Sequence, residues 1–187
     1  VGSEMCIRDS TTTLPAAQTA PVWEFDAKAN ISFATATDEN KSLSFQNTCG
    51  LIRFKNNLTD LTAIKLTAQG VNIAGNVKID ASGNLTVESG SNVITVSAKE
   101  GTFVGPNDAN ANAKEYSMVV PPVTFTGGFT LELSKTSGNE TYTFSGENLT
   151  ITKGQIVTIE LKEGGQPPVV EEQTTAIVAS AQEIVTD

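Results

Sequence analysis

Hydrophobic side chains recur at every second position in short segments that turn residues separate. The clearest case is residues 71–79, where Val71, Ile73, Gly75, Val77 and Ile79 alternate with mostly polar neighbours. Successive side chains of a β-strand point to opposite faces, so this spacing predicts a strand with one buried face. The turn residues at 80–84 then predict a hairpin, with a returning strand from 85.

Segments of this kind continue along the chain, at 31–33, 43–45, 49–54, 64–67, 93–96, 116–120, 129–133, 142–144, 149–151 and 156–161. No amphipathic helix between them is long enough for a parallel crossover. The pattern predicts an all-β fold, an antiparallel β-sandwich of about seven strands. Ten side chains are expected to be mostly buried: Phe45, Leu51, Phe54, Ile64, Leu66, Ile73, Val77, Tyr116, Phe129 and Leu131.

The two ends of the chain differ from this central part. Residues 1–10, VGSEMCIRDS, correspond to the translated end of a transposase sequencing adapter and are excluded from the predicted fold. Residues 11–29 are rich in Thr, Ala and Pro and predict an extended leader, and the sandwich is expected over residues 30–162. Residues 163–187 begin with Gly and Pro and predict a linker followed by a truncated or disordered tail. A short helix, an extended segment or the start of a second domain all fit that tail.

Composition restricts the chemistry that the chain can perform. The 187 residues include no histidine and carry a net charge of −9. Histidine is the commonest general base and metal ligand, and a nucleic-acid-binding surface needs a basic patch. No phosphate-binding glycine loop and no cysteine or histidine metal motif is present. We therefore expect no enzyme activity, no catalytic, cofactor-binding or metal-binding residues, no cofactor and no nucleic-acid partner.

Two features are candidates for chemistry, and each has a simpler explanation. Cys49 lies in an apolar run without a histidine partner, so it is expected to be a small buried side chain. The loop at 105–112 matches the first three ligand positions of an EF-hand calcium loop. The match then fails, because Ala113 and Val119 replace the glycine and the glutamate. An asparagine-rich solvated loop is therefore expected.

Trp23 and Phe25 leave two interpretations open. Their rings are either an exposed platform for stacking on sugars or an anchor that docks the first strand. The wider stretch at 22–37 places Trp23, Phe25, Ile31 and Phe33 at odd positions, as a detachable apolar strand covering a sheet edge would need. A permanent first strand explains this spacing equally well.

Several segments resemble, in order, the segments of one family. LSFQNTCGLIRF at 43–54 resembles the F-x-N-x-C-G-L-L-x-F segment of fimbrillin-like proteins, which are pilus and surface lipoproteins of Gram-negative anaerobes. Similar segments follow in the family's order: IKL at 64–66, VNIAGNV at 71–77, YSMVVP at 116–121, FTGGF at 125–129 and LTITKGQI at 149–156. The resemblance covers about residues 33–161.

The resemblance implies a transthyretin-like sandwich in a structural or adhesive subunit of a cell-surface fimbria. It implies export to the outer membrane by a signal sequence and lipid anchor ahead of residue 11. Subunits would join by strand exchange, and a host protein or glycan would be a further partner. The alternative is a carbohydrate-binding module of a surface lipoprotein. Gly50 and Gly75 are expected where another chain segment approaches closely, and Pro121 and Pro122 are expected to end a strand.

Overall fold

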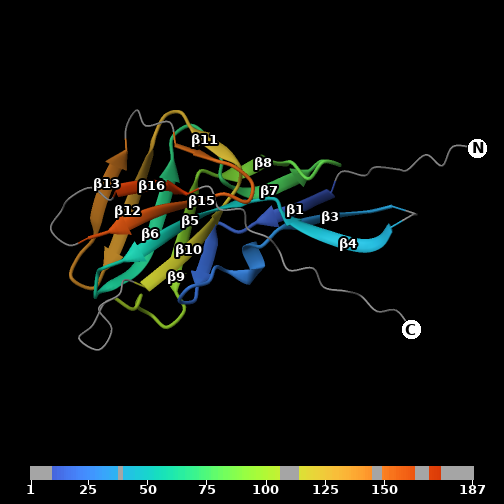
Figure 1. The fold of residues 1–187 in the computed structure, drawn as a ribbon. Coiled ribbons are helices and arrows are strands. Elements are labelled where there is room, and N and C mark those ends of the chain that lie inside the picture. The colour runs from blue at the N-terminus through green and yellow to red at the C-terminus, as the bar shows by residue number, and fades with distance from the viewer. Residues whose placement is uncertain (1–9, 38–39, 106–113, 145–148, 163–168, 174–187) are drawn as a thin grey trace, which may run out of the picture.

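The computed structural model describes residues 10–37, 40–105, 114–144, 149–162 and 169–173. These residues form strands and one short 3₁₀ helix, η1 (Ala27–Ala29), so the predicted all-β class is confirmed. No helix within these ranges is long and apolar enough to cross a bilayer. Figure 1 shows a broad body of packed sheets, from which β1, β3, β4, β7 and β8 extend to one side.

Two sheets make up the body. The larger one contains five strands in the order β13 (Glu140–Phe144), β12 (Phe129–Lys135), β6 (Leu61–Ala68), β9 (Val93–Ala98) and β2 (Ala17–Ala20). The other contains four strands in the order β10 (Lys114–Val120), β5 (Gly50–Asn56), β15 (Ile156–Leu161) and β16 (Val169–Gln173). Their facing apolar side chains form the main core, which includes Phe54, Leu66, Tyr116, Leu131 and Ile159. This arrangement is the expected sandwich.

Three smaller groups of strands complete the fold. A three-stranded sheet has the order β1 (Ser10–Leu14), β7 (Ala74–Ile79) and β8 (Leu85–Ser91). The remaining pairs are β3 (Ser32–Thr37) with β4 (Asn40–Asn47), and β11 (Val123–Phe125) with β14 (Leu149–Ile151). A second core packs against the opposite face of the four-stranded sheet, because Leu51, Val119 and Ile156 alternate with residues that point into the main core. Val77 and Ile79 of β7 cover this second core.

The structure corrects the predicted strand number and direction. The described residues contain sixteen strands, instead of about seven. Two pairs run parallel, β5 with β15 and β2 with β9, whereas the sequence pattern predicted antiparallel pairing throughout. Alternation of apolar residues reports which face of a strand is buried and carries no information on the direction of its neighbours.

The two end segments also differ from expectation. Residues 11–29, expected as a leader outside the sandwich, contribute β1, β2 and η1, and Ser10 from the excluded N-terminal segment opens β1. Within 163–187, expected as linker and tail, β16 pairs antiparallel with β15. Both end segments add strands to existing sheet edges, where backbone hydrogen bonds hold a strand that has few apolar side chains.

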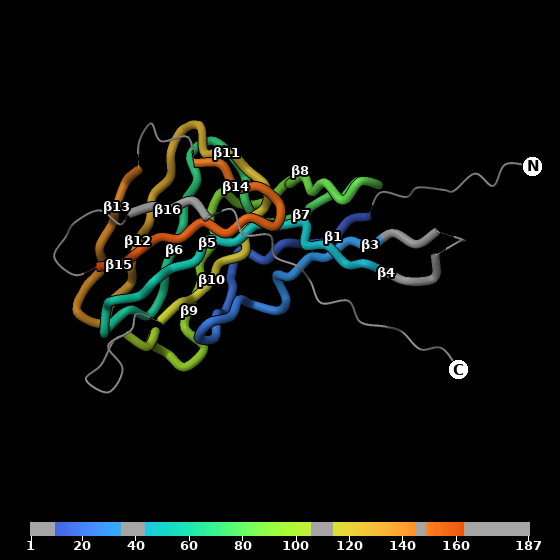
Figure 2. Tube along the Cα trace, in the orientation of Figure 1, coloured from blue at the N-terminus to red at the C-terminus, as the bar shows by residue number. Residues whose placement is uncertain are grey.

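Nine of the ten expected core residues have exposed fractions of 8% or less. Phe45 is the exception, with 37% of its surface exposed. It lies on β4, which among the described strands pairs with β3 alone, and Figure 2 shows this hairpin projecting from the body. A projecting two-stranded hairpin has no second sheet to cover its apolar side chains.

The predicted single strand at 71–79 is divided between the two cores. Ile73 precedes β7 and is buried in the main core, whereas Val77 belongs to the second core. Between them, Gly75 has a φ of +122°, and a Cβ added to it would lie 2.6 Å from the Cα of Gly90. Close approach at this glycine is confirmed, and the turn it makes transfers the strand from one core to the other.

Other local predictions are confirmed. The Asp80 carboxylate accepts hydrogen bonds from the backbone N–H groups of Ser82 and Asn84 at 2.8 and 2.9 Å, which closes the β7–β8 hairpin. Strand β10 ends at Val120, directly before the two prolines. A Cβ on Gly50 would lie 2.5 Å from Cγ2 of Ile151, so this glycine also marks a close approach.

Candidate functional site at the edge of strand β10

Strand β10 is an edge strand of the four-stranded sheet, and the N-terminal segment of the chain covers its free edge. The Gln18 side chain, only 2% exposed, provides the first contact. Its Nε2 donates to the carbonyl of Val119 at 2.9 Å, and the N–H of Val119 donates to its Oε1 at 2.9 Å. A side-chain amide here satisfies the two backbone groups that a neighbouring strand would otherwise bind.

A bent loop provides the second contact with this edge. The N–H of Trp23 donates to the carbonyl of Glu115 at 2.7 Å, and the N–H of Ser117 donates to the carbonyl of Glu24 at 3.2 Å. Trp23 has a φ of +66°, a left-handed conformation that a bulky residue adopts at a cost of roughly 1 kcal/mol. The free edge of β10 is therefore covered by a side chain and a strained loop.

The same segment also binds the edge of the five-stranded sheet. Strand β2 pairs with β9 through four residues, in parallel, and the N–H of Thr95 donates to the carbonyl of Ala16 at 2.7 Å. The carboxylate of Asp26 accepts hydrogen bonds from the N–H groups of Thr19 and Lys28, each at 2.9 Å. Asp26 thus ties β2 to η1 and fixes the loop between them.

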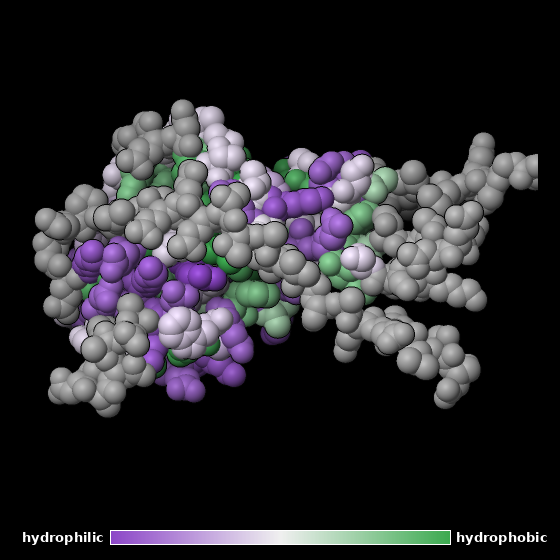
Figure 3. All heavy atoms as spheres, viewed as in Figure 1, coloured by the Kyte–Doolittle hydropathy of each residue, from purple (hydrophilic) through white to green (hydrophobic). Residues whose placement is uncertain are grey.

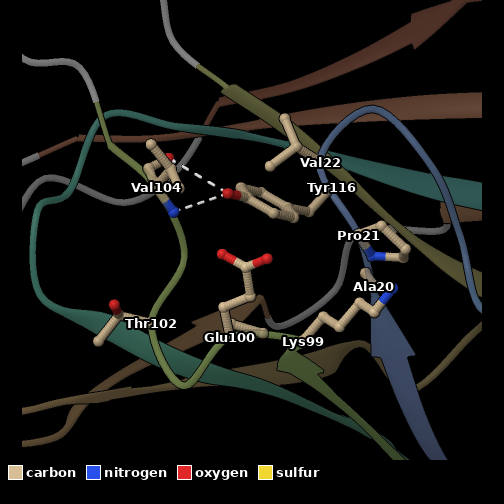
Figure 4. A pocket seen from close by; sticks show the side chains of 9 residues that line it. Ala20, Pro21, Val22, Lys99, Glu100, Thr102, Val104 and Tyr116 are labelled. Atoms are coloured by element: carbon tan, nitrogen blue, oxygen red, sulfur yellow. Dashed lines mark hydrogen bonds between the residues drawn. The ribbon is translucent and has the colours of Figure 1, made fainter.

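Where this segment enters the main core, the side chain that it buries is small. Ala20 is 1% exposed and belongs to the core, yet it lies beside a cavity of about 150 Å³. The cavity is bounded by the loop after β2, by the connection from β9 to β10, and by Tyr116 of β10 (Figure 4). The cavity opens to solvent on the side where Lys99 and Glu100 are exposed, so β2 covers this end of the sandwich incompletely.

Tyr116 forms a rigid wall of the cavity. Its hydroxyl accepts a hydrogen bond from the N–H of Val104 at 2.6 Å and donates to the carbonyl of Val104 at 3.4 Å. Its ring packs edge-to-face on Phe103, with centroids 4.4 Å apart. Burial raises the pKa of the Tyr116 hydroxyl, so the group stays protonated in this position.

The structure separates Trp23 from Phe25. Trp23 is 57% exposed, whereas Phe25 is half-buried and packs against the second core. The anchor interpretation therefore fits Phe25, and the exposed-platform interpretation fits Trp23 alone. Among the described side chains, Phe45 is the only other exposed aromatic ring. Phe25 lines a small described cavity, whereas Trp23 and Phe45 line neither of the described cavities.

The stretch at 22–37 is not one continuous strand. The left-handed Trp23 and η1 interrupt it, and only β3 is extended and paired, with β4. Neither a single detachable strand nor a first strand over this whole stretch matches the structure. The preceding segment, from β1 to Glu24, covers the edges of β9 and β10 instead. Its small and polar residues gave no hydrophobic pattern from which this covering role could be predicted.

Cys49 is a free cysteine, 4% exposed, in the turn between β4 and β5. Burial raises the pKa of its thiol to about 12, against a smaller opposing effect of the Thr48 hydroxyl. The predicted small buried side chain is therefore confirmed, although it lies in a turn and not within a strand. Of the candidate calcium loop, residues 106–113 lie outside the described residues. In the rest of the described chain, no three His, Cys, Asp or Glu side chains could hold a metal ion together.

Figure 3 shows the chemistry of one face of the molecule. Hydrophilic side chains gather on the lower part of the body in this view, and hydrophobic ones are visible in its upper part and where it narrows toward β1 and β3. The exposed large hydrophobic side chains of the described residues are Trp23, Phe45 and Val104. Two of them contact β10 through hydrogen bonds: the N–H of Trp23 donates to the carbonyl of Glu115, and the N–H of Val104 donates to the Tyr116 hydroxyl.

No protein-family model matches the chain, and no curated protein sequence matches it. Among solved structures, a candidate cell adhesion protein from Bacteroides ovatus ATCC 8483 aligns with a TM-score of 0.47 and 11% identity, covering 84% of this chain and 61% of that one. A candidate cell adhesion protein from Bacteroides fragilis NCTC 9343 aligns with a TM-score of 0.35 and 15% identity, covering 77% and 49%. The chain therefore spans less than two thirds of the length of either protein.

Proposed function

We propose that this chain is an adhesive or structural subunit of a cell-surface fimbria, held at the outer membrane by a lipid anchor, and that its subunits join by strand exchange. The fimbrial role rests on the ordered resemblance to fimbrillin-like segments. Strand exchange rests on one observation, the reciprocal pair between Gln18 and Val119, which satisfies the edge of β10 without a strand.

The cover over β10 has the properties of a replaceable element. It is the most N-terminal part of the described residues, and it lies at the edges of the two sheets, with no place in their interior. Its parallel ladder with β9 is four residues long, and the side chain that it buries in the main core is the small Ala20, next to the partly buried Val22. Leu14 of β1 is buried in the second core. Removing residues 10–24, which include β1 and β2, would expose the edges of β9 and β10 at one end of the sandwich. An extended strand from a second subunit could then bond to either edge, as in β-strand addition.

A truncated protein that starts at Phe25 tests this proposal. We expect it to unfold cooperatively at a lower melting temperature and to bind a synthetic peptide of residues 10–24, which restores the melting temperature. A peptide with Gln18→Ala should restore it less, and a scrambled peptide should not restore it. Loss of the cooperative transition with no rescue by the peptide would show that the segment is a permanent part of the fold.

A carbohydrate-binding module remains the second candidate, and exposed Trp23 is the observation that favours it. An aromatic ring held outward at a strained backbone position could stack on a sugar ring. Sugar sites usually add further aromatic or polar groups around one cleft, and Trp23 does not line either described cavity. Glycan-array binding that Trp23→Ala abolishes, with an unchanged melting temperature, would favour this candidate over the fimbrial subunit.

A further inference from the structure

The cavity beside Tyr116 has an exposed carboxylate at its mouth. Glu100 follows β9, and Figure 4 shows its carboxylate directed into the cavity, toward the Tyr116 ring and hydroxyl. Within the described part of the chain, no hydrogen bond or ion pair involves Glu100. The Tyr116 hydroxyl donates to the carbonyl of Val104, and no hydrogen bond joins it to Glu100. A ligand with a positive charge could form an ion pair with this carboxylate.

The other walls of the cavity are mainly apolar. Ala20, Pro21, Val22 and Ala98 form them together with the Tyr116 ring. Lys99 extends toward Ala20 and away from the Glu100 carboxylate, so the two opposite charges do not pair (Figure 4). The cavity thus combines an aliphatic and aromatic wall with one acidic group. Such a combination suits a long aliphatic side chain that ends in a cation.

The size of the cavity agrees with one such side chain. A volume of about 150 Å³ accommodates about five water-sized groups at roughly 30 Å³ each. A lysine side chain has five non-hydrogen atoms, four of them carbons that would contact the apolar wall. The net charge of −9 on the whole chain attracts cationic partners over longer distances. A sugar would need several hydrogen-bonding groups around one cleft. The polar side chains of this wall are Lys99, Glu100, Thr102 and Tyr116, and the Tyr116 hydroxyl is already bonded to Val104.

We propose that this cavity binds the side chain of a lysine presented by a partner protein, with its ammonium group at Glu100 and its methylenes against Val22, Ala98 and Tyr116. The proposal does not depend on strand exchange, because it concerns the chain with β2 in place. The ion pair would lie at the cavity mouth, where Glu100 is exposed. Individual affinity for one lysine is therefore weak, and the contact would add to a larger interface.

Titration of the full chain with Nα-acetyl-lysine amide, followed by methyl NMR of Val22 and Ala98, tests the site. We expect saturable shifts of both methyl groups. The matched probe Nα-acetyl-norleucine amide has the same aliphatic stem without the ammonium group, and it should bind up to about fivefold more weakly. Equal shifts with both probes, or no shift with the lysine probe, would overturn the proposal.

Two variants at exposed positions distinguish the contribution of the Glu100 carboxylate from that of the neighbouring Lys99 ammonium group. Glu100→Gln should weaken lysine binding about fivefold, whereas the adjacent Lys99→Gln should leave it unchanged or strengthen it. Unchanged melting temperatures would show that both variants keep the fold. Unaltered lysine binding by Glu100→Gln, or binding of N-acetylglucosamine at the same methyl groups in preference to the lysine probe, would contradict the assignment.

Discussion

Gln18 and Val119 exchange two hydrogen bonds of 2.9 Å each, although they lie 101 residues apart. Both residues are 2% exposed, so water cannot replace either bond. Gln18 belongs to the edge strand of the five-stranded sheet and Val119 to the edge strand of the four-stranded sheet. One side chain therefore links the edge strands of the two sheets.

Replacement of Gln18 tests how much this contact stabilises the fold. Gln18→Ala leaves the N–H and the carbonyl of Val119 buried without partners, and we expect a loss of about 2–4 kcal/mol in the free energy of unfolding. Urea denaturation measures the loss. The control is Gln46→Ala, which changes an exposed side chain on β4. Equal stability of the two variants would show that the bond to Val119 contributes nothing.

The cavity predicts the effect of a larger side chain at Ala20. Ala20→Leu would place apolar atoms in existing space, so we expect thermal stability to stay equal or to rise, by up to about 1 kcal/mol. The same substitution at Ala68, which is fully buried on β6 and lines neither described cavity, should destabilise the protein by about 1–3 kcal/mol. Ala20→Leu should also abolish binding of the lysine probe. Similar destabilisation by both substitutions would mean that the space beside Ala20 is not available.

Strand prediction from the sequence succeeded where apolar residues alternate or run together. The main core covers one face of β5, β6 and β12, so their apolar residues form patterns that the sequence shows. The predicted segments therefore include Ile64 and Leu66 on β6, Phe129 and Leu131 on β12, and the apolar run on β5. Strands β1 and β2 carry the sequences STTTL and AQTA, in which a single large apolar residue, Leu14, gives no period. Their position depends on backbone pairing with distant strands, which one-dimensional patterns do not record.

The candidate site could not be predicted for a related reason. A buried glutamine looks like a surface residue in any hydrophobic pattern, and only its partner Val119 explains why Gln18 is inside. Phe45 shows the opposite error, because an apolar residue in an alternating segment was expected in the core. Its exposure follows from the absence of any sheet beyond β3 and β4 among the described pairings.

The buried thiol of Cys49 predicts a specific dependence of stability on pH. Its pKa is about 12 in the folded protein, against an ordinary value of 9.0. The unfolded chain therefore loses this proton first, so this contribution to stability is fully present below pH 9 and decreases as the pH rises toward 12. The decrease is at most about 1.4 kcal/mol per pH unit.

The stability difference between the natural chain and Cys49→Ala isolates this effect, since the other titrating groups contribute equally to both proteins. Urea denaturation at pH 7, 8, 9, 10 and 10.5 should give a constant difference up to about pH 8. Above pH 9 the difference should shift in favour of the alanine variant. A difference that stays constant up to pH 10.5 would show that the folded thiol ionises normally.

Gly50 predicts a steric effect at the start of β5. A Cβ there would lie 2.7 Å from the carbonyl oxygen of Thr152, in addition to its contact with Ile151, so we expect Gly50→Ala to cost more than 2 kcal/mol. Gly70→Ala is the control, because its Cβ would enter open space and would incur only the cost of a φ of +74°, roughly 1 kcal/mol. Thermal denaturation should rank Gly50→Ala below Gly70→Ala, and the reverse order would contradict the close approach.

Native-state hydrogen exchange of the full chain tests most directly whether the segment that covers β10 can detach from a folded sandwich. The amides of Thr19, Ala20 and Val119 report the cover, and those of Ile52 and Phe54 on β5 report global unfolding. We predict that the first group exchanges through an opening at least about 2 kcal/mol less costly than the opening that exposes β5. Equal opening free energies for both groups would show that the cover unfolds only with the whole domain, and would contradict strand exchange at this edge.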